Sequence, residues 1–131
     1  MKNLKIICLS TILSLLILSP IYGNDTEIIF FNNSDHSVSD ANEIDVEIDG
    51  EQVCSLKKKE YYKIEFTSGR HRIGVQQKID GRTAYGWAAN VRVRKGRFYI
   101  QVDAKPTSTT FKEVSHLPPF FESNYSTSGW W

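Results

Sequence analysis

The amino-acid sequence predicts an all-β protein, an antiparallel β-sandwich of about seven to eight strands with a C-terminal tail outside the sandwich. Apolar and polar residues alternate with a period of two through most of residues 26–103, which is the pattern of strands with one buried face. Turn-forming residues recur at intervals of roughly ten to fifteen positions. No segment of this range carries the three-and-four spacing of apolar residues that a helix needs.

Residues 1–23 precede the predicted domain and have the composition of a secretory signal peptide. Lys2 and Lys5 come before an apolar run over 6–18, and turn-forming residues lead to Gly23, after which we expect cleavage. The run is 13 residues long, whereas a helix that spans a bilayer needs roughly 20. We therefore expect a periplasmic or secreted protein, without a transmembrane helix once this segment is removed.

The strands follow in order, each bounded by turn chemistry. The predicted strands cover residues 27–31, 43–49, 52–56, 62–66, 70–76, 89–94, 98–103 and 111–114. Asp49-Gly50 predicts a hairpin, because the second residue of this dipeptide tolerates positive φ, and Asp80-Gly81 marks another turn. The stretch 82–89, which contains Tyr85-Gly86-Trp87, alternates less regularly than the others.

The strand 43–49 alternates three aliphatic residues with four acidic ones. Ile44, Val46 and Ile48 are expected in the core, and all four carboxylates in water. From His116 onward the alternation is lost, and an aromatic segment without a period runs to Trp131. The predicted organisation is therefore a signal peptide at 1–23, a β-sandwich domain at 24–115 and a flexible tail at 116–131.

Charge and cysteine content limit the function classes. Without Lys2 and Lys5, 14 basic and 15 acidic residues remain, a formal net charge of −1. This balance gives no reason to propose nucleic acid as a partner. Cys8 lies in the signal peptide, which leaves Cys54 without an intramolecular disulfide partner. We expect Cys54 to be buried in a strand, with an intermolecular disulfide or a reactive thiol as the alternative.

The turn motifs resemble those of a bacterial domain family of unknown function that is common in envelope lipoproteins and similar to PEGA-type β-sandwich domains. The residues that carry the resemblance are Val46-Glu47-Ile48-Asp49-Gly50, Leu56, Tyr61-Tyr62, Ser68-Gly69-Arg70-His71, Gly96, Phe98 and Tyr99. The chain departs from the family by having Ser68 where proline is usual and by lacking the lipoprotein cysteine. The resemblance implies an envelope-facing sandwich with a binding or structural role and transfers no catalytic residue.

Catalytic motifs are missing from the sequence. It has no Gly-rich phosphate loop, no nucleophile elbow and no paired His or Cys spacing typical of a metal site. We therefore expect a protein that is not an enzyme and needs no cofactor or metal. A small secreted hydrolase or metal-binding protein, built from Asp35, His36 and the acidic strand, is the alternative.

Two groups of residues are candidates for binding. Outward-facing arginines would form one cationic patch if their strands are neighbours, and arginine suits carboxylate and phosphate groups; alternatively they pair with the acidic strand. Aromatic rings in loops and in the tail can stack on sugars or anchor a protein contact, although Trp87 can instead close the end of the core. The candidate binding residues are Arg70, Arg72, Arg92, Arg94, Tyr85, Trp87, Trp130 and Trp131.

These observations together predict a non-catalytic, exported binding or scaffold module of the bacterial cell envelope. Its expected partner is an envelope protein or an anionic glycan. A third hypothesis is that the tail is donated as a strand to the sheet edge of a partner.

Overall fold

The computed structural model describes residues 23–128. The elements are β1 (Thr26–Asn32), β2 (Glu43–Ile48), β3 (Glu51–Leu56), β4 (Glu60–Phe66), β5 (Gly69–Ile79), β6 (Arg82–Val93), β7 (Gly96–Lys105), β8 (Ser108–Val114), α2 (Phe121–Asn124) and β9 (Ser126–Thr127). The predicted signal peptide, apart from Gly23, lies outside the described residues, as do Trp130 and Trp131. Within 23–128, no helix has the length and apolar character needed to cross a membrane.

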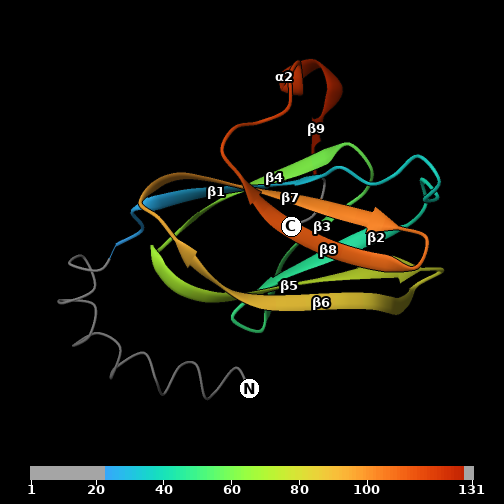
Figure 1. The fold of residues 1–131 in the computed structure, drawn as a ribbon, viewed down its shortest axis with the longest axis horizontal. Coiled ribbons are helices and arrows are strands. Elements are labelled where there is room, and N and C mark those ends of the chain that lie inside the picture. The colour runs from blue at the N-terminus through green and yellow to red at the C-terminus, as the bar shows by residue number, and fades with distance from the viewer. Residues whose placement is uncertain (1–22, 129–131) are drawn as a thin grey trace, which may run out of the picture.

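The strands form two packed sheets, which confirms the predicted β-sandwich (Figure 1). Sheet A has the order β8-β7-β1-β4-β9, and sheet B has the order β3-β2-β5-β6. Two pairings differ from the antiparallel expectation, because β1 lies parallel to β7 and β9 lies parallel to β4. A hairpin cannot join parallel neighbours, and β2 to β6 accordingly intervene between β1 and β7.

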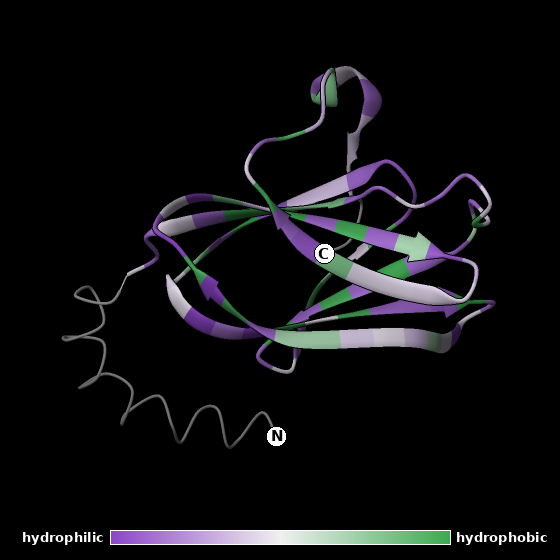
Figure 2. Cartoon of the chain, in the orientation of Figure 1, coloured by the Kyte–Doolittle hydropathy of each residue, from purple (hydrophilic) through white to green (hydrophobic). Residues whose placement is uncertain are grey.

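Inward-facing side chains of both sheets fill one hydrophobic core. Figure 2 shows the alternation as successive hydrophobic and hydrophilic bands along the strands. Ile44, Val46 and Ile48 are each at most 2% exposed, as predicted. Cys54 is fully buried on β3, and this burial raises the pKa of its thiol.

Both predicted Asp-Gly turns are present, and each closes a hairpin. Asp49-Gly50 joins β2 to β3, and Asp80-Gly81 joins β5 to β6. The aspartate and the glycine have positive φ in each turn, with values of 53° and 86° in the first and 52° and 76° in the second. Only turns with this twist connect adjacent antiparallel strands in two residues without splaying them.

Strand β6 carries a bulge at Tyr85, which accounts for its irregular sequence pattern. Gln77 pairs with Ala84 and Gln76 pairs with Gly86, so Tyr85 has no opposite residue. Its φ of 31° is unusual for a bulky side chain. Because side chains alternate with a period of two, this one extra residue reverses the faces of everything that follows it in β6.

The four carboxylates of the acidic strand do not all lie in water. Asp45 is only 6% exposed. It accepts a hydrogen bond from Ser55 Oγ at 2.8 Å and forms an ion pair with Lys78 Nζ at 3.1 Å. The expectation of full solvation was therefore wrong for Asp45, because its neighbours on β3 and β5 supply a hydroxyl and an ammonium group that cover it.

The tail expected at residues 116–131 packs on the domain over its described part, 116–128. Residues 115–125, here called the strap, cross the outer face of sheet A from β8 to β4, and β9 then joins the sheet (Figure 1). Tyr125 packs edge-on against Phe31, with ring centroids 5.6 Å apart, and its hydroxyl donates to Asn33 Oδ1 at 3.1 Å. Phe31 is fully buried beneath the strap, so aromatic contacts hold this segment on the domain.

Candidate binding surface

Three arginines lie together on the outer face of sheet B. Arg70 on β5 is directly opposite Arg92 on β6, and Arg72 lies two residues further along β5, opposite Asn90. All three side chains are exposed. We call Arg70, Arg72 and Arg92 the arginine patch.

The Tyr85 bulge is what brings Arg92 into this patch. The hairpin register set by Asp80-Gly81 would place Val91 opposite Arg70, but the extra residue shifts the pairing by one. Arg92 then faces solvent, whereas Val91 packs partly buried against the core. The patch thus depends on a local irregularity that simple alternation through β6 does not reveal.

Two carboxylates that contact the chain beside Arg70 and Arg72 are held by hydrogen bonds to groups other than a guanidinium. Asp49 Oδ1 accepts the backbone N–H of Arg72 at 2.9 Å, and Asp49 Oδ2 lies 2.6 Å from His71 Nδ1. The Arg72 N–H and, after it, the hydrogen bond with His71 lower the pKa of Asp49. Asp25 is likewise bonded to the hydroxyl and the N–H of Ser68, and these hydrogen bonds lower its pKa.

Among residues 23–128, the acidic strand forms no ion pair with the arginine patch. Glu43, Asp45 and Glu47 on β2 lie opposite Lys78, Gln76 and Gly74 of β5, respectively. Arg70 and Arg72 lie beyond this stretch, toward the start of β5. Asp49, the fourth carboxylate of the acidic strand, lies beside Arg72: its backbone N–H donates to the carbonyl oxygen of Arg72 at 2.8 Å, and its carboxylate accepts the backbone N–H of Arg72. Within residues 23–128, none of the ion pairs shorter than 4 Å joins a patch arginine to a carboxylate.

Arg94 lies near the patch in sequence but interacts with the other sheet. Its guanidinium pairs with Glu113 of β8 and lies over the ring of Phe98, 5.2 Å from the centroid. The expectation that Arg94 belongs to the same cationic patch therefore needs correction. Arg94 follows β6 of sheet B directly and contacts β7 and β8 of sheet A, so it bridges the two sheets.

Tyr85 and Trp87 lie toward the opposite end of β6. Arg92 is seven residues beyond Tyr85, or roughly 20 Å along a strand. Trp87 is 45% exposed and its ring packs against Phe111 of β8, with centroids 4.9 Å apart. The aromatic rings and the arginine patch are therefore separate surfaces, and Trp87 covers the side of the sandwich where β6 approaches β8.

His71 is the one histidine with a carboxylate and a hydroxyl both within reach. Its Nδ1 faces Asp49, but its Nε2 lies 2.8 Å from the carbonyl oxygen of Thr67 and 3.3 Å from the Thr67 hydroxyl. A nitrogen that donates to a carbonyl cannot also accept a proton from a nucleophile. The ring thus ties the first hairpin to the start of β5.

Residues 23–128 contain no set of side chains that could bind the metal of the metal-binding alternative. Asp35 and His36 form an exposed pair at 3.0 Å. The Asp35 carboxylate also accepts the backbone N–H of Ser37, which lowers its pKa. In this described part of the chain, no group of three or more His, Cys, Asp or Glu side chains converges on one point.

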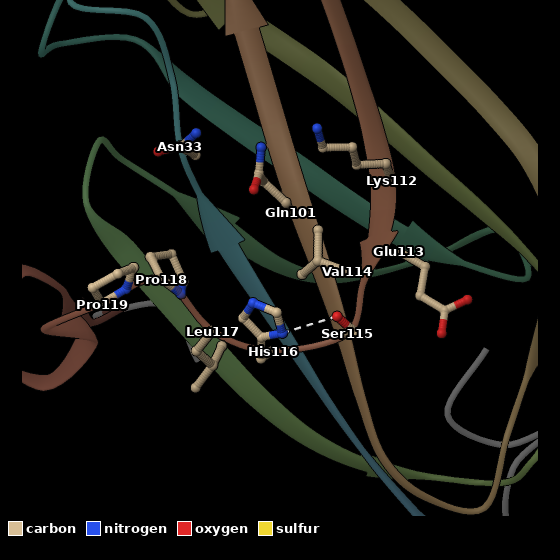
Figure 3. A pocket seen from close by; sticks show the side chains of 10 residues that line it. All are labelled: Asn33, Gln101, Lys112, Glu113, Val114, Ser115, His116, Leu117, Pro118 and Pro119. Carbon is tan, nitrogen blue, oxygen red and sulfur yellow. Dashed lines mark hydrogen bonds between the residues drawn. The ribbon is translucent and has the colours of Figure 1, made fainter.

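Sheet A has a second surface feature, a shallow hollow of about 580 Å³ beside the strap. Figure 3 shows its lining from Asn33, which follows β1, from β7 and β8, and from the first residues of the strap. Several of its polar side chains already have partners: His116 Nδ1 lies 2.9 Å from Ser115 Oγ, Asn33 accepts from Tyr125, and Gln101 donates to Asp103. The hollow therefore offers a ligand fewer free polar groups than the arginine patch.

Comparison with protein-family models, curated proteins and solved structures found no match. Function is therefore inferred from the geometry of the chain itself. Two of the motifs behind the PEGA-type resemblance contact each other, because the Asp-Gly turn supplies Asp49 and the Gly-x-His step supplies His71. The sequence analysis did not predict the contact between Asp49 and His71. The signal that could have indicated it is an aspartate in the turn after one strand and a histidine near the start of another.

Proposed function

We propose that this chain is an exported, non-catalytic β-sandwich of the bacterial cell envelope that binds an anionic glycan through the arginine patch. The export pattern of residues 1–23 and the PEGA-type resemblance support the location. The observation that carries the binding proposal is the placement of Arg70 directly opposite Arg92, with no carboxylate of the described residues in an ion pair with either.

Like charges at directly opposite positions of an antiparallel pair destabilise the sheet. A sequence that keeps two arginines there, with a third beside them, retains an unfavourable interaction that a bound anion would relieve. Each guanidinium can donate two parallel hydrogen bonds to a carboxylate or phosphate. The patch therefore fits a ligand with several closely spaced acidic groups.

A glycan suits the patch better than a protein does. Protein interfaces are usually centred on buried aromatic or aliphatic anchors. The exposed large aromatic rings among residues 23–128 are Tyr85, Trp87 and Phe120; the first two lie elsewhere on β6, and Phe120 lies on the strap. The patch itself has polar neighbours, with Asn90 beside it and Asp49 at its edge. Repeating acidic sugars offer charge without requiring an apolar anchor.

The test uses residues 24–131, which contain all the described strands. Calorimetric titration with a polyuronate, a neutral glucan and polyglutamate is compared for the parent chain and two variants. Arg70→Glu/Arg92→Glu reverses the patch, whereas Arg82→Glu makes the same type of change at the opposite end of β6, roughly 30 Å from Arg92.

We expect the parent chain to bind the polyuronate, and increasing salt to weaken this binding through counterion release. The patch variant should lose at least about tenfold in affinity, because charge-assisted hydrogen bonds contribute roughly 1.5 to 3 kcal/mol each. Arg82→Glu should retain the parent affinity. Binding of polyglutamate alone would instead point to an acidic protein, and equal affinities of both variants would remove the patch from consideration.

A further inference from the structure

A second hollow, of about 630 Å³, lies on the outer face of sheet A where the strap crosses toward β4. Its apolar surface comes from Ile29 of β1, Tyr61 of β4, and Phe120 and Phe121 of the strap. We call it the Phe120 hollow. Its volume is within the range of about 300 to 1,000 Å³ that is typical of sites for small ligands.

Phe120 presents its ring to solvent at this hollow. Its residue surface is 80% exposed, far more than that of Tyr85 or Trp87. Its φ of 57° and ψ of 34° place the backbone in the left-handed region, which is unfavourable for a bulky side chain. Such a conformation persists only where the surrounding structure holds it, and it occurs often at ligand sites. A ring this exposed gives little packing within the domain in return.

The backbone around Phe120 is held in place. Its carbonyl oxygen accepts the N–H of Ser123 at 3.2 Å and the hydroxyl of Ser123 at 3.0 Å. Phe121, the next residue, packs against Tyr61 with ring centroids 5.0 Å apart. Pro118-Pro119 comes before Phe120, and the proline ring fixes φ. The Phe120 ring is therefore carried by an ordered backbone, so a ligand would bind it at a low cost in backbone ordering.

The charged side chains that line the hollow are balanced. Glu27 lies 3.9 Å from Lys63 Nζ and 3.5 Å from Arg97 Nε. Glu122 of the strap adds a second carboxylate. Two cations and two carboxylates give no net charge, in contrast to the arginine patch on sheet B. The hollow thus offers hydrogen-bond donors and acceptors without an excess charge that would select an ion.

We propose that the Phe120 hollow binds a neutral sugar unit, which stacks on the Phe120 ring and forms hydrogen bonds with Glu27 and Lys63. A pyranose ring presents C–H groups on its faces and hydroxyl groups around its edge. It therefore matches an exposed aromatic face beside a balanced set of donors and acceptors. This site lies on the opposite sheet from the arginine patch, and the proposal is independent of glycan binding there.

A protein partner fits the hollow less well. Stable protein interfaces bury about 1,200 to 2,000 Å² in total, around a cluster of apolar anchors. Among the rings that line the hollow, Phe120 is exposed, whereas Tyr61 and Phe121 are already partly buried. A single exposed ring with charged neighbours is enough for a sugar face but does not form an apolar cluster.

The experiment titrates cellotetraose into residues 24–131 and follows the backbone amide resonances by NMR. Cellotetraose is neutral, and the equatorial hydroxyls of its glucose units leave flat C–H faces. The amides of Ile29, Phe120 and Phe121 should shift together, whereas those of Arg70 and Arg92 should stay in place.

Two substitutions at Phe120 separate the ring from its other properties. Phe120→Tyr keeps an aromatic ring, whereas Phe120→Leu keeps a bulky apolar side chain without one. Both retain the β-carbon, so the backbone restriction is the same as in the parent chain. Phe120→Leu should weaken cellotetraose binding at least about fivefold, and Phe120→Tyr should change it by less than about twofold.

Three results would overturn the proposal. The first is no shift of the amides around Phe120 at about 10 mM cellotetraose, a concentration at which even a weak site is occupied. The second is equal affinity of the leucine and tyrosine variants. The third is tighter binding at the same amides of either tetragalacturonate or the peptide Gly-Phe-Leu-Gly, which would assign the hollow to an anionic sugar or to a protein segment, respectively.

Discussion

Replacing Arg92 by glutamate should stabilise the domain while weakening its binding to an anionic glycan. In the parent chain Arg92 lies directly opposite Arg70 and diagonally from Arg72. The substitution turns a like-charge cross-strand pair into an opposite-charge pair and leaves the backbone pairing intact. The free energy of unfolding should therefore rise while the affinity for the glycan falls.

The expected size of the effect follows from this geometry. Directly opposite charged pairs in a sheet contribute roughly 0.2 to 1 kcal/mol, favourable or unfavourable according to sign. Because all these side chains are exposed, solvent weakens the interaction, and a total change of about 0.5 to 1 kcal/mol in the free energy of unfolding is expected. For a domain of this size, that corresponds to a rise of roughly 2 to 6 °C in Tm.

The assay is urea denaturation of the parent chain, Arg70→Glu, Arg92→Glu and the double variant, in about 0.1 M and about 1 M salt. Each single variant should be more stable than the parent, and the double variant should return close to it, because two glutamates repel as two arginines do. High salt should remove most of these differences, since the screening length falls from about 10 Å to about 3 Å. Destabilisation by Arg92→Glu, or a double variant as stable as the single ones, would refute the reasoning.

Three further outcomes are expected. Tyr125→Phe removes the hydroxyl that donates to Asn33 Oδ1, so the free energy of unfolding in urea should fall by about 1 kcal/mol. An unchanged free energy of unfolding would mean that this hydrogen bond does not hold the strap. Hydrogen bonds in the folded state lower the pKa of Asp49 below its ordinary value of 3.8. The stability that they contribute is therefore present above that value and is lost as the pH falls through the lower folded pKa. In urea titrations between about pH 6 and pH 2, the free energy of unfolding should fall less for Asp49→Asn than for the parent. Burial raises the pKa of Cys54, so a thiol reagent should react with it only at the rate of unfolding, and rapid reaction of the native protein would contradict its placement in the core.

Much of the fold was predictable because it depends on local sequence chemistry. The two Asp-Gly turns and the alternating aliphatic residues of β2 place hairpins and core residues correctly. The parallel pairing of β1 with β7 was not predictable in this way. The two strands are about seventy positions apart, and no single turn connects one directly to the other. Alternation identifies strands but does not select distant partners.

The arginine patch was predictable only in part. The pattern of β5 places Arg70 and Arg72 on one face, as the structure confirms. The position of Arg92 depends on the Tyr85 bulge, which the sequence shows only as an irregular stretch, and Arg94 pairs with Glu113 on a different sheet. The docking of Tyr125 was missed because aromatic residues without a period indicate a tail until a complementary surface, here Phe31 and Asn33, is known.

The central claim is that the arginine patch binds an anionic glycan, and NMR observation of the arginine side-chain N–H groups during titration with a polyuronate tests it most directly. The resonances of Arg70, Arg72 and Arg92 should shift together and saturate at one ligand concentration. Those of Arg82, at the opposite end of β6, should stay in place. Shifts confined to the hollow beside the strap, or no shift at millimolar ligand, would contradict the claim.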